Sequence, residues 1–340
     1  MRAFAEESAG GVTVQNAQDQ VLTELRRADK LLLTTHENPD GDALGSLLAM
    51  HWILEQLDKD SLMFMSPDEF PLPSEYRGWT FDGLVGAPPD DVAERTIVFL
   101  DCGNIDRMPV DFLQAEGLHI LNIDHHHDNT RFGTVNLVCS AASCTAEIVW
   151  RLAPELGAEI TPPIADALYV GLVTDTGRFM YENTTPQAHR MAAELIEAGV
   201  EPHRVYRRLY EDLPLSRLEL LQRALASVER YDDGVMTVAH LTKRDYEETG
   251  ALETDSEGVV DHMRAVEGTA VAVLVRDLLS DDRDGTRKVS LRATDTRVDV
   301  SRVAREFGGG GHPQAAGFST PLAYPELIGE LRRLVRAQLG

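Results

Sequence analysis

Lysine is scarce in this chain of 340 residues: four of its 32 basic residues are lysine and 28 are arginine. Acidic residues number 56, so the formal net charge at pH 7 is -24. Such a surface repels nucleic acid at long range, unless a salty cytosol screens the repulsion. The acids are spread along the chain, which favours adaptation to salt over an acidic partner-binding face. The net charge therefore says little about the substrate, and an anionic substrate would need a local basic pocket.

Aromatic residues, cysteines and long apolar runs are also few. The aromatic content of 6% and the few lysines argue against a long single-strand groove with stacking platforms. The three cysteines, Cys102, Cys139 and Cys144, show no metal-type pairing, which indicates a reduced cytosolic setting. No apolar stretch approaches the roughly 18 residues of a membrane span, and residues 1–19 lack the positive start and apolar core of a secretion signal. We therefore expect a cytoplasmic protein with no membrane association.

Hydrophobic periodicity predicts an α/β domain in the first half of the chain. The length favours two domains, and a composition of 43% hydrophobic and 26% charged residues is ordinary for globular proteins. Short buried runs predict strands at residues 30–35, 61–66, 95–100 and 118–123. Helical spacing predicts helices at residues 20–29, 43–57, 143–156 and 163–174. Strands that alternate with helices indicate a parallel doubly wound sheet.

The pattern changes in the second half of the chain. A helical pattern spans residues 185–230. Beyond it we expect strands at 235–241, 269–275 and 286–292, helices at 256–266, 300–307 and 324–339, and a hairpin tip at 281–285. The chain should therefore divide into a flexible lead-in (1–19), a first α/β domain (20–184), a helical connector (185–230) and a smaller α/β domain (231–340).

Histidine and aspartate residues gather where three of the predicted strands end. They are His36, Asp40, Asp42, Asp101, Asp124, His125 and His126. The carboxyl ends of strands in an open α/β sheet face the ligand crevice. So many carboxylates in one pocket would raise each other's pKa without a cation. Histidine and carboxylate ligands suit Mn²⁺, Mg²⁺ or Zn²⁺. The pattern therefore predicts a divalent metal site, although Asp40-Gly41-Asp42 by itself is also typical of a turn and helix cap.

Two further segments carry candidate functional residues. Asp175 ends an apolar helical pattern, where the helix dipole disfavours a carboxylate, so a bound metal would explain its position better than a simple turn. Gly308 to Gly311 precede His312 and are typical of either a hinge or a loop whose N–H groups approach an anion. We favour phosphate contact for this loop.

These motifs occur together and in a recognisable order. They read H-E-N-P-D-G-D (36–42), L-D-C-G (100–103), I-D-H-H (123–126), V-T-D-T-G-R-F (173–179), V-S-L-R (289–292) and G-G-G-G-H-P-Q-A-A-G-F (308–318). In them the chain resembles the DHH phosphoesterase superfamily, in the subgroup with a DHH-associated C-terminal domain. The length and tight spacing resemble the nano-RNase (oligoribonuclease)/pAp-phosphatase type. The resemblance covers nearly the whole chain and implies an active site in the cleft between two α/β domains.

The resemblance also implies roles for individual residues. Two divalent metals are expected, with Mn²⁺ ahead of Mg²⁺. One metal would be held by His36, Asp40 and Asp101, and the other by Asp42, Asp101, His125 and Asp175, so that Asp101 bridges the two. His126 would contact the substrate or assist the leaving group, and with Asp101 it completes the expected catalytic residues. Substrate contacts are expected from Arg292, His312, Gly310, Gly311 and Arg178. His127 departs from the family pattern, and its role is open.

The implied activity is hydrolysis of short RNA or DNA oligonucleotides to nucleoside monophosphates. The same pocket would convert 3′-phosphoadenosine 5′-phosphate (pAp) to AMP. The alternatives are a RecJ-like exonuclease on longer single strands, a linear or cyclic dinucleotide phosphodiesterase, and a non-catalytic nucleic-acid-binding relative. The intact ligand set argues against the last of these. The order of preference among dinucleotide, pAp and longer oligomers stays open, and a homodimer is one option for the assembly.

Overall fold

A computed structural model of the chain describes residues 8–9, 12–76, 78–108, 110–211, 213–279 and 285–340. The chain forms two compact units, which divide between residues 211 and 212. Most of the hairpin tip predicted at 281–285 lies outside the described residues. Among the described residues, none of the helices combines the length and the apolar character needed to cross a bilayer.

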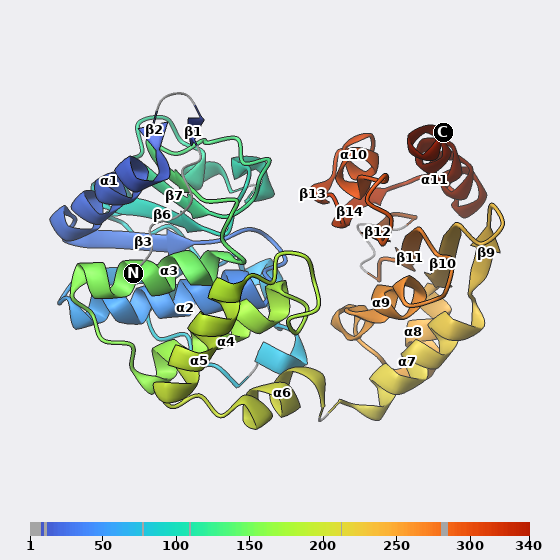
Figure 1. The fold of residues 1–340 in the computed structure, drawn as a ribbon, viewed down its shortest axis with the longest axis horizontal. Coiled ribbons are helices and arrows are strands. Elements are labelled where there is room, and N and C mark those ends of the chain that lie inside the picture. The colour runs from blue at the N-terminus through green and yellow to red at the C-terminus, as the bar shows by residue number, and fades with distance from the viewer. Residues whose placement is uncertain (1–7, 10–11, 77, 109, 212, 280–284) are drawn as a thin grey trace. The chain divides into compact units, whose positions relative to one another are not determined.

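The first unit is built on a six-stranded parallel sheet, as the sequence predicts (Figure 1). Its strands are β3 (Lys30–Thr34), β4 (Asp60–Phe64), β5 (Leu84–Val85), β6 (Thr96–Leu100), β7 (Ile120–Asp124) and β8 (Val135–Val138). They lie in the order β5-β4-β3-β6-β7-β8. The chain therefore extends the sheet on one side of β3 and then returns to extend it on the other. This reversal places a topological switch point between β3 and β6, where open α/β sheets bind ligands at the carboxyl ends of the strands.

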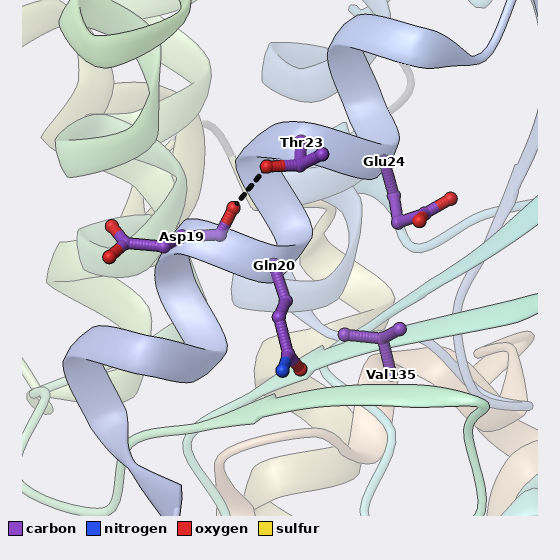
Figure 2. Close-up of a pocket in the computed structure, with 5 residues that line it drawn as sticks. All are labelled: Asp19, Gln20, Thr23, Glu24 and Val135. Carbon is purple, nitrogen blue, oxygen red and sulfur yellow. Dashed lines mark hydrogen bonds between the residues drawn. The ribbon is translucent and has the colours of Figure 1, made fainter.

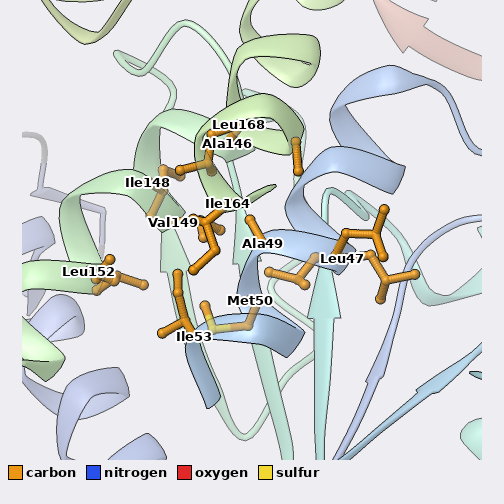
Figure 3. Close-up of a cluster of buried hydrophobic side chains, with 14 of the residues drawn as sticks. Leu47, Ala49, Met50, Ile53, Ala146, Ile148, Val149, Leu152, Ile164 and Leu168 are labelled. Carbon is orange, nitrogen blue, oxygen red and sulfur yellow. The ribbon is translucent and has the colours of Figure 1, made fainter. Parts of the chain in front are cut away.

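Helices cover one face of this sheet. They are α1 (Val14–Arg27), α2 (Gly41–Gln56), α3 (Thr145–Leu156) and α4 (Pro162–Asp175), followed by α5 (Pro186–Glu197) and α6 (Pro202–Tyr210). Figure 3 shows how side chains of α2, α3 and α4 meet in the buried cluster. From the sheet, Leu31 and Leu33 of β3 belong to this core, while Leu32 faces the other way. Such alternation is the period of a strand, and it divides the sheet into two buried faces.

The opposite face is covered by short turns and loops. Phe99 of β6 packs there with Met108, Leu113 and Phe132, and the rings of Phe99 and Phe132 meet edge to face at 5.1 Å. Both faces of the parallel strands are therefore buried, which is the usual condition for parallel sheets and explains their continuous hydrophobic runs.

The N-terminal helix differs from its prediction. The sequence predicts a flexible lead-in through residue 19 and a helix over 20–29, whereas α1 already begins at Val14. Thr13 caps it by accepting a hydrogen bond from the N–H of Asn16 at 3.3 Å. Val14, Ala17 and Val21 fall on the buried side of α1, so the apolar stripe extends into the predicted lead-in. The preceding β1 (Ser8–Ala9) and β2 (Val12–Thr13) pair with each other.

The second unit contains a mixed six-stranded sheet. Its strands are β9 (Glu229–Tyr231), β10 (Met236–Leu241), β11 (Val271–Asp277), β12 (Arg287–Ala293), β13 (Gly310–His312) and β14 (Ala315–Thr320), in the order β13-β14-β12-β11-β10-β9. Only β10 and β11 run parallel within this described sheet. Its helices are α7 (Leu215–Ala226), α8 (Lys243–Thr249), α9 (Val259–Arg264), α10 (Val300–Arg305) and α11 (Tyr324–Leu339). The predicted α/β class is confirmed for both units.

The glycine-rich segment is not the open loop that the sequence predicts. Gly310 to His312 form β13, which pairs antiparallel with β14 and turns back through Pro313 and Gln314. A Cβ on Gly311, whose φ is +133°, would lie 2.5 Å from the carbonyl oxygen of Ala315. Strand packing therefore requires glycine at this position, whatever the hairpin binds.

Candidate metal centre

The predicted metal ligands of the first unit converge at the carboxyl edge of its sheet. His36 follows β3, Asp101 follows β6, and His125 follows Asp124, the last residue of β7. All four side chains are at most 6% exposed. They meet at the switch point between β3 and β6, where the strand order reverses.

Asp40 and Asp42 approach the same edge from the start of α2. Asp40 caps the helix, accepting hydrogen bonds from the N–H groups of Asp42 and Ala43 at 3.0 and 3.1 Å. Asp42 lies in the first turn and is buried. Its two oxygens accept from the N–H groups of Thr145 and Ala146, at 2.7 and 2.9 Å. The Asp42 carboxylate therefore joins the start of α2 to the start of α3, where helix N–H groups favour an anion.

Asp175 comes from the far end of α4, and close helix packing brings it near Asp42. A Cβ on Gly171 would lie 2.7 Å from the Ala146 methyl and 2.8 Å from an Asp42 oxygen. A Cβ on Gly45 would lie 2.3 Å from the carbonyl oxygen of Ala167. Glycine at these two positions allows α2 and α4 to approach more closely than side chains would permit. The carboxylate of Asp175 also accepts a hydrogen bond from Asn183 at 3.0 Å.

Within the described part of the first unit, three groups of side chains could each hold a cation, with ligand atoms within 4.8 Å of one another. They are His36, Asp40 and Asp101; Asp42, His125 and Asp175; and Asp101, Asp124 and His126. The first group contains the residues of one predicted ligand set, and the second contains those of the other set except Asp101. The third adds Asp124, to which the sequence assigned no separate role.

Asp101 lies between the first two groups. One of its oxygens, Oδ2, is 3.6 Å from Nε2 of His36, and the other, Oδ1, is 3.5 Å from Nε2 of His125. Its backbone has a φ of +57°, a conformation that is uncommon for residues other than glycine. Thr145 holds the side chain by donating from its hydroxyl to Oδ1 at 2.9 Å. The two carboxylate oxygens of Asp101 therefore face different histidines.

The acids in this cluster crowd each other electrostatically. Burial, and then the negative charges of Asp101, Asp175 and Asp40, raise the pKa of Asp42 well above its ordinary value. Burial and the neighbouring carboxylates likewise raise the pKa of Asp175 to about 7. For Asp101, burial acts in the same direction, but the nearby histidines outweigh it and hold the pKa well below the usual range. Buried carboxylates with raised pKa values are the environment that a divalent cation stabilises. Carboxylate and imidazole donors together fit a divalent metal of the first transition row or Mg²⁺.

His126 is oriented by Asp124 rather than by the predicted metal ligands. Its Nδ1 lies 2.7 Å from Oδ1 of Asp124. Burial would lower the pKa of His126, but the carboxylates of Asp124 and Asp101 outweigh burial and raise it to about 9. Asn129 donates to the other oxygen of Asp124 at 2.5 Å and to the Asn122 side chain at 2.7 Å. This arrangement leaves Nε2 as the ring nitrogen of His126 that points away from Asp124.

Some supporting residues were not predicted from the sequence. They are Asn129, Thr145, Ala146 and Asn183, which hold Asp124, Asp101, Asp42 and Asp175. Their hydrogen bonds cross long or irregular stretches of chain, so no local motif marks these residues. Such outer partners orient metal ligands in most metalloenzymes.

The predicted substrate residues lie in two places. Arg178 follows Asp175 in the first unit and is exposed. In the second unit, Arg292 of β12 and His312 of β13 lie at one register, because each pairs with Ala315 of the intervening β14. The guanidinium Nε of Arg292 is 3.5 Å from a carboxylate oxygen of Asp261. Gly310 and Gly311 precede His312 on the same strand.

An open pocket of about 450 Å³ lies elsewhere in the first unit (Figure 2). It is lined by Asp19, Gln20, Thr23, Glu24 and Val135, from α1 and β8. None of the predicted site residues lines it. Its two carboxylates would repel a nucleotide phosphate, so the pocket does not compete with the metal-ligand cluster as a candidate active site.

Comparison with known proteins agrees with this geometry. Residues 30–172 match the DHH family, N-terminal domain, and residues 236–340 match the DHHA1 domain. The bifunctional oligoribonuclease and PAP phosphatase NrnA of Thermus thermophilus is 36% identical over 291 residues, which cover 84% of this chain and 83% of that protein. The chain belongs to the DHH family. The resemblance predicted from the motifs is therefore confirmed.

Other relatives of this DHH protein, and solved structures of similar proteins, are consistent with that assignment. The bifunctional oligoribonuclease and PAP phosphatase NrnA of Bacillus subtilis is 26% identical over 86% of this chain and 89% of its own length. An exopolyphosphatase-related protein from Bacteroides fragilis superposes with a TM-score of 0.81 at 26% identity, covering 97% of this chain and 98% of that one. RecJ from Thermus thermophilus, solved with Mn²⁺, shares the fold with a TM-score of 0.55 at 14% identity, covering 99% of this chain and 56% of that one.

Proposed function

We propose that this DHH protein is a metal-dependent phosphoesterase that hydrolyses short oligonucleotides to nucleoside monophosphates and pAp to AMP. The observation that carries the proposal is Asp101, whose two oxygens face His36 and His125 separately at 3.6 and 3.5 Å. A carboxylate in this position can bridge two cations. The names of the Thermus and Bacillus relatives support the substrate class.

In this proposal the first unit binds two divalent metals, Mn²⁺ ahead of Mg²⁺. His36, Asp40 and Asp101 would hold one ion, and the other would be held by Asp42, Asp101, His125 and Asp175. When bound, such a pair lowers the pKa of an attacking water and neutralises charge on the phosphoryl oxygens. Thr145, Ala146 and Asn183 keep the carboxylates oriented before the substrate arrives.

His126 would act on the substrate rather than hold a metal. In the metal-free protein, the Asp124 carboxylate outweighs burial and raises the pKa of His126, which favours the imidazolium form. In that form Nε2 carries a proton and can donate it, as a hydrogen bond to a phosphate oxygen or to the leaving oxygen. Asn129 and Asp124 fix the ring for this task, as the carboxylate does in other histidine-carboxylate pairs.

The remaining contacts would recognise the substrate. In the second unit, Arg292, His312, Gly310 and Gly311 would bind a substrate phosphate, and Arg178 would contact the substrate from the first unit. The planar fork of arginine suits phosphate because it donates two parallel hydrogen bonds. We further propose that residues 20–184 are catalytic, that residues 185–230 connect the domains, and that residues 231–340 bind the substrate in a cytoplasmic protein, with a homodimer as one option.

The test is the hydrolysis of labelled 2-mer, 5-mer and 20-mer oligonucleotides, in RNA and in DNA, together with pAp. Each is measured with Mn²⁺, Mg²⁺, Zn²⁺ and excess chelator at fixed salt. The proposal expects metal-dependent release of mononucleotides, fastest from the 2-mer and 5-mer. Faster cleavage of the 20-mer would favour a RecJ-like exonuclease, and binding without turnover under every metal would favour a non-catalytic relative.

A further inference from the structure

The chain that follows Asp175 adopts an unusual backbone conformation. Gly177, Arg178 and Phe179 have φ angles of +54°, +64° and +64° in succession. Left-handed geometry is costly for residues with side chains, and for an aromatic residue such as Phe179 it is a genuine outlier. Strained positions of this kind persist only where the surrounding structure holds them, and they cluster at functional sites.

Hydrogen bonds tie this turn to the candidate metal centre. Thr176 accepts from the N–H of Phe179 through its hydroxyl, at 3.2 Å. Asn183, at the far end of the segment, donates to the backbone carbonyl and to the carboxylate of Asp175, at 3.1 and 3.0 Å. The segment therefore starts next to Asp175 in the chain, and its far end is hydrogen-bonded back to Asp175. Three Cα–Cα steps of a trans chain place Arg178 within about 11 Å of that ligand.

The strained turn presents Arg178 against an aromatic pair on α6. The guanidinium carbon lies 5.0 Å from the ring centroid of Tyr210, and the ring of Tyr206 lies 5.2 Å from that of Tyr210, with the two ring planes tilted by 50°. Tyr206 is 45% exposed, and Arg178 is exposed as well. Within the described chain, Arg178 makes no ion pair. We name Arg178, Tyr210 and Tyr206 the stacking row.

Arg178 gives the row a positive charge in a chain whose net charge is -24. The three arginines of α6 add less positive charge than their number suggests, because Arg204 pairs with Glu201 at 3.0 Å and Arg208 with Asp166 at 2.7 Å. Nucleobases stack on aromatic rings and on the flat face of arginine, and a guanidinium that already lies on a tyrosine ring keeps its other face for a ligand. A positive charge above an aromatic ring also strengthens the stack.

We propose that the stacking row binds a nucleobase of the substrate, beside the phosphate that the metal centre hydrolyses. This proposal rests on the proposed function. It adds a binding site for the nucleobase, the part of the substrate that the metal ligands do not recognise. The turn at 177–179 aims Arg178, Tyr210 holds its plane, and Tyr206 extends the surface. The competing explanation is that the Arg178–Tyr210 contact only tethers the segment and so keeps Asp175 in place.

The two explanations predict different effects of substitutions on the hydrolysis of substrates that lack a base. The substrates to compare are the dinucleotide ApA and two abasic analogues of it. In one analogue hydrogen replaces the first adenine, and in the other it replaces the second. Base-aromatic stacking is worth roughly five- to hundredfold in affinity. We expect Tyr206→Ala to lower kcat/KM for ApA about tenfold, mainly through KM, and to lower the preference for ApA over one of the analogues by the same factor. Tyr206→Phe should restore that preference because the ring is what stacks.

Arg208→Ala is the matched control. Arg208 belongs to the same helix and stacks on Trp79 at 5.4 Å, but it pairs with Asp166 instead of meeting the segment after Asp175. Its loss should leave the preference for the base unaltered. Equal losses on ApA and both analogues in Tyr206→Ala would overturn the proposal in favour of a tether. No loss on any of the three would overturn it as well.

Failure of the proposed function would be visible separately. If the unmodified protein hydrolyses no nucleotide, equilibrium binding of AMP and ribose 5-phosphate replaces turnover. Tighter binding of AMP that is lost in Tyr206→Ala and kept in Tyr206→Phe would support the base site without the hydrolase. Equal affinities for the two ligands in the unmodified protein would overturn the base site.

Discussion

Gly171 offers a test of how the fold brings its metal ligands together. Position 171 lies inside α4, where a Cβ would stand 2.7 Å from the Ala146 methyl and 2.8 Å from an Asp42 oxygen. Ordinary contacts begin at 3.4 Å, so the neighbours would have to move by roughly half an ångström or more. Gly171→Ala should therefore push α2 and α3 away from α4 at the point where Asp42 is held.

Two opposing effects decide the magnitude. Alanine in a helix interior is favoured over glycine by about 1 kcal/mol. Overpacking a tight core costs about 1–3 kcal/mol. We expect Gly171→Ala to destabilise the protein by up to about 2 kcal/mol, the difference between these two effects. Because Asp42 is displaced, Mn²⁺ affinity should fall about tenfold or more, as it does when support of a metal ligand is lost.

The assay is urea unfolding with excess chelator, followed by Mn²⁺ titration of the folded protein. Gly329→Ala is the matched control, because Gly329 is a helical glycine of α11 whose Cβ position has no atom within 4 Å apart from its chain neighbours and the backbone of its own helix. That substitution should stabilise by up to about 1 kcal/mol and leave Mn²⁺ affinity unchanged. If Gly171→Ala stabilises as much as Gly329→Ala and binds Mn²⁺ normally, close packing of α2 and α4 is not what positions Asp42.

Three other predictions concern the division of labour among residues. His125→Ala should lose bound Mn²⁺, whereas His126→Ala should keep it and lose turnover, because Nδ1 of His126 is held by Asp124; metal analysis of both variants checks this, and equal metal loss would contradict it. Arg292→Ala and His312→Ala should keep the metals and lose on the order of 2 kcal/mol in kcat/KM for dinucleotides and pAp, but less for bis-p-nitrophenyl phosphate; a proportional loss on all substrates would assign these residues to the chemistry or the fold. In the second unit, the half-exposed side chain of Glu257 pairs with Arg276 at 3.0 Å, and the charges of Arg276, Lys288 and Arg292 lower the pKa of Glu257 to about 2. A carboxylate whose pKa is lowered by folding stabilises the folded protein at pH values above its unfolded-state pKa, and this stabilisation is lost as the pH falls toward 2. Glu257→Gln should therefore lower the thermal unfolding temperature more at pH 7 than at pH 3. An equal effect at the two pH values would refute the ion-pair explanation.

The metal-ligand cluster was predictable because the buried strands and the acidic and histidine residues that follow them are both visible as local sequence patterns. Buried runs such as 120–123 mark strands, and Asp124 and His125 come directly after them. In a parallel sheet, strand ends share one edge, so residues far apart in the chain can be placed together from the strand pattern alone. Asp175 was predictable for a different reason, since a carboxylate at a helix C-terminus is unfavourable by itself.

What could not be predicted depends on contacts between distant residues. Asn129 and Thr145 are ordinary polar residues in the sequence, and only the fold aims them at Asp124 and Asp101. β5 and β8 are short and carry weak strand patterns, so the extent of the sheet was missed. Gly311 looked like part of a loop because sequence alone does not tell a flexible glycine from one required by the close approach of β14.

The central claim is that Asp101 bridges two metals, and Asp101→Asn tests it most directly. Asparagine keeps an oxygen that can accept from Thr145, so folding should change little, but the amide cannot serve two cations. Asp106→Asn makes the same chemical change at an exposed neighbour. The measurement is Mn²⁺ bound per chain together with turnover of a dinucleotide. We expect two tightly bound ions in the unmodified protein and in Asp106→Asn, and in Asp101→Asn loss of tight binding with no more than a few percent of turnover. Two tightly bound ions, or more than a few percent of turnover, in folded Asp101→Asn would contradict the bridging role.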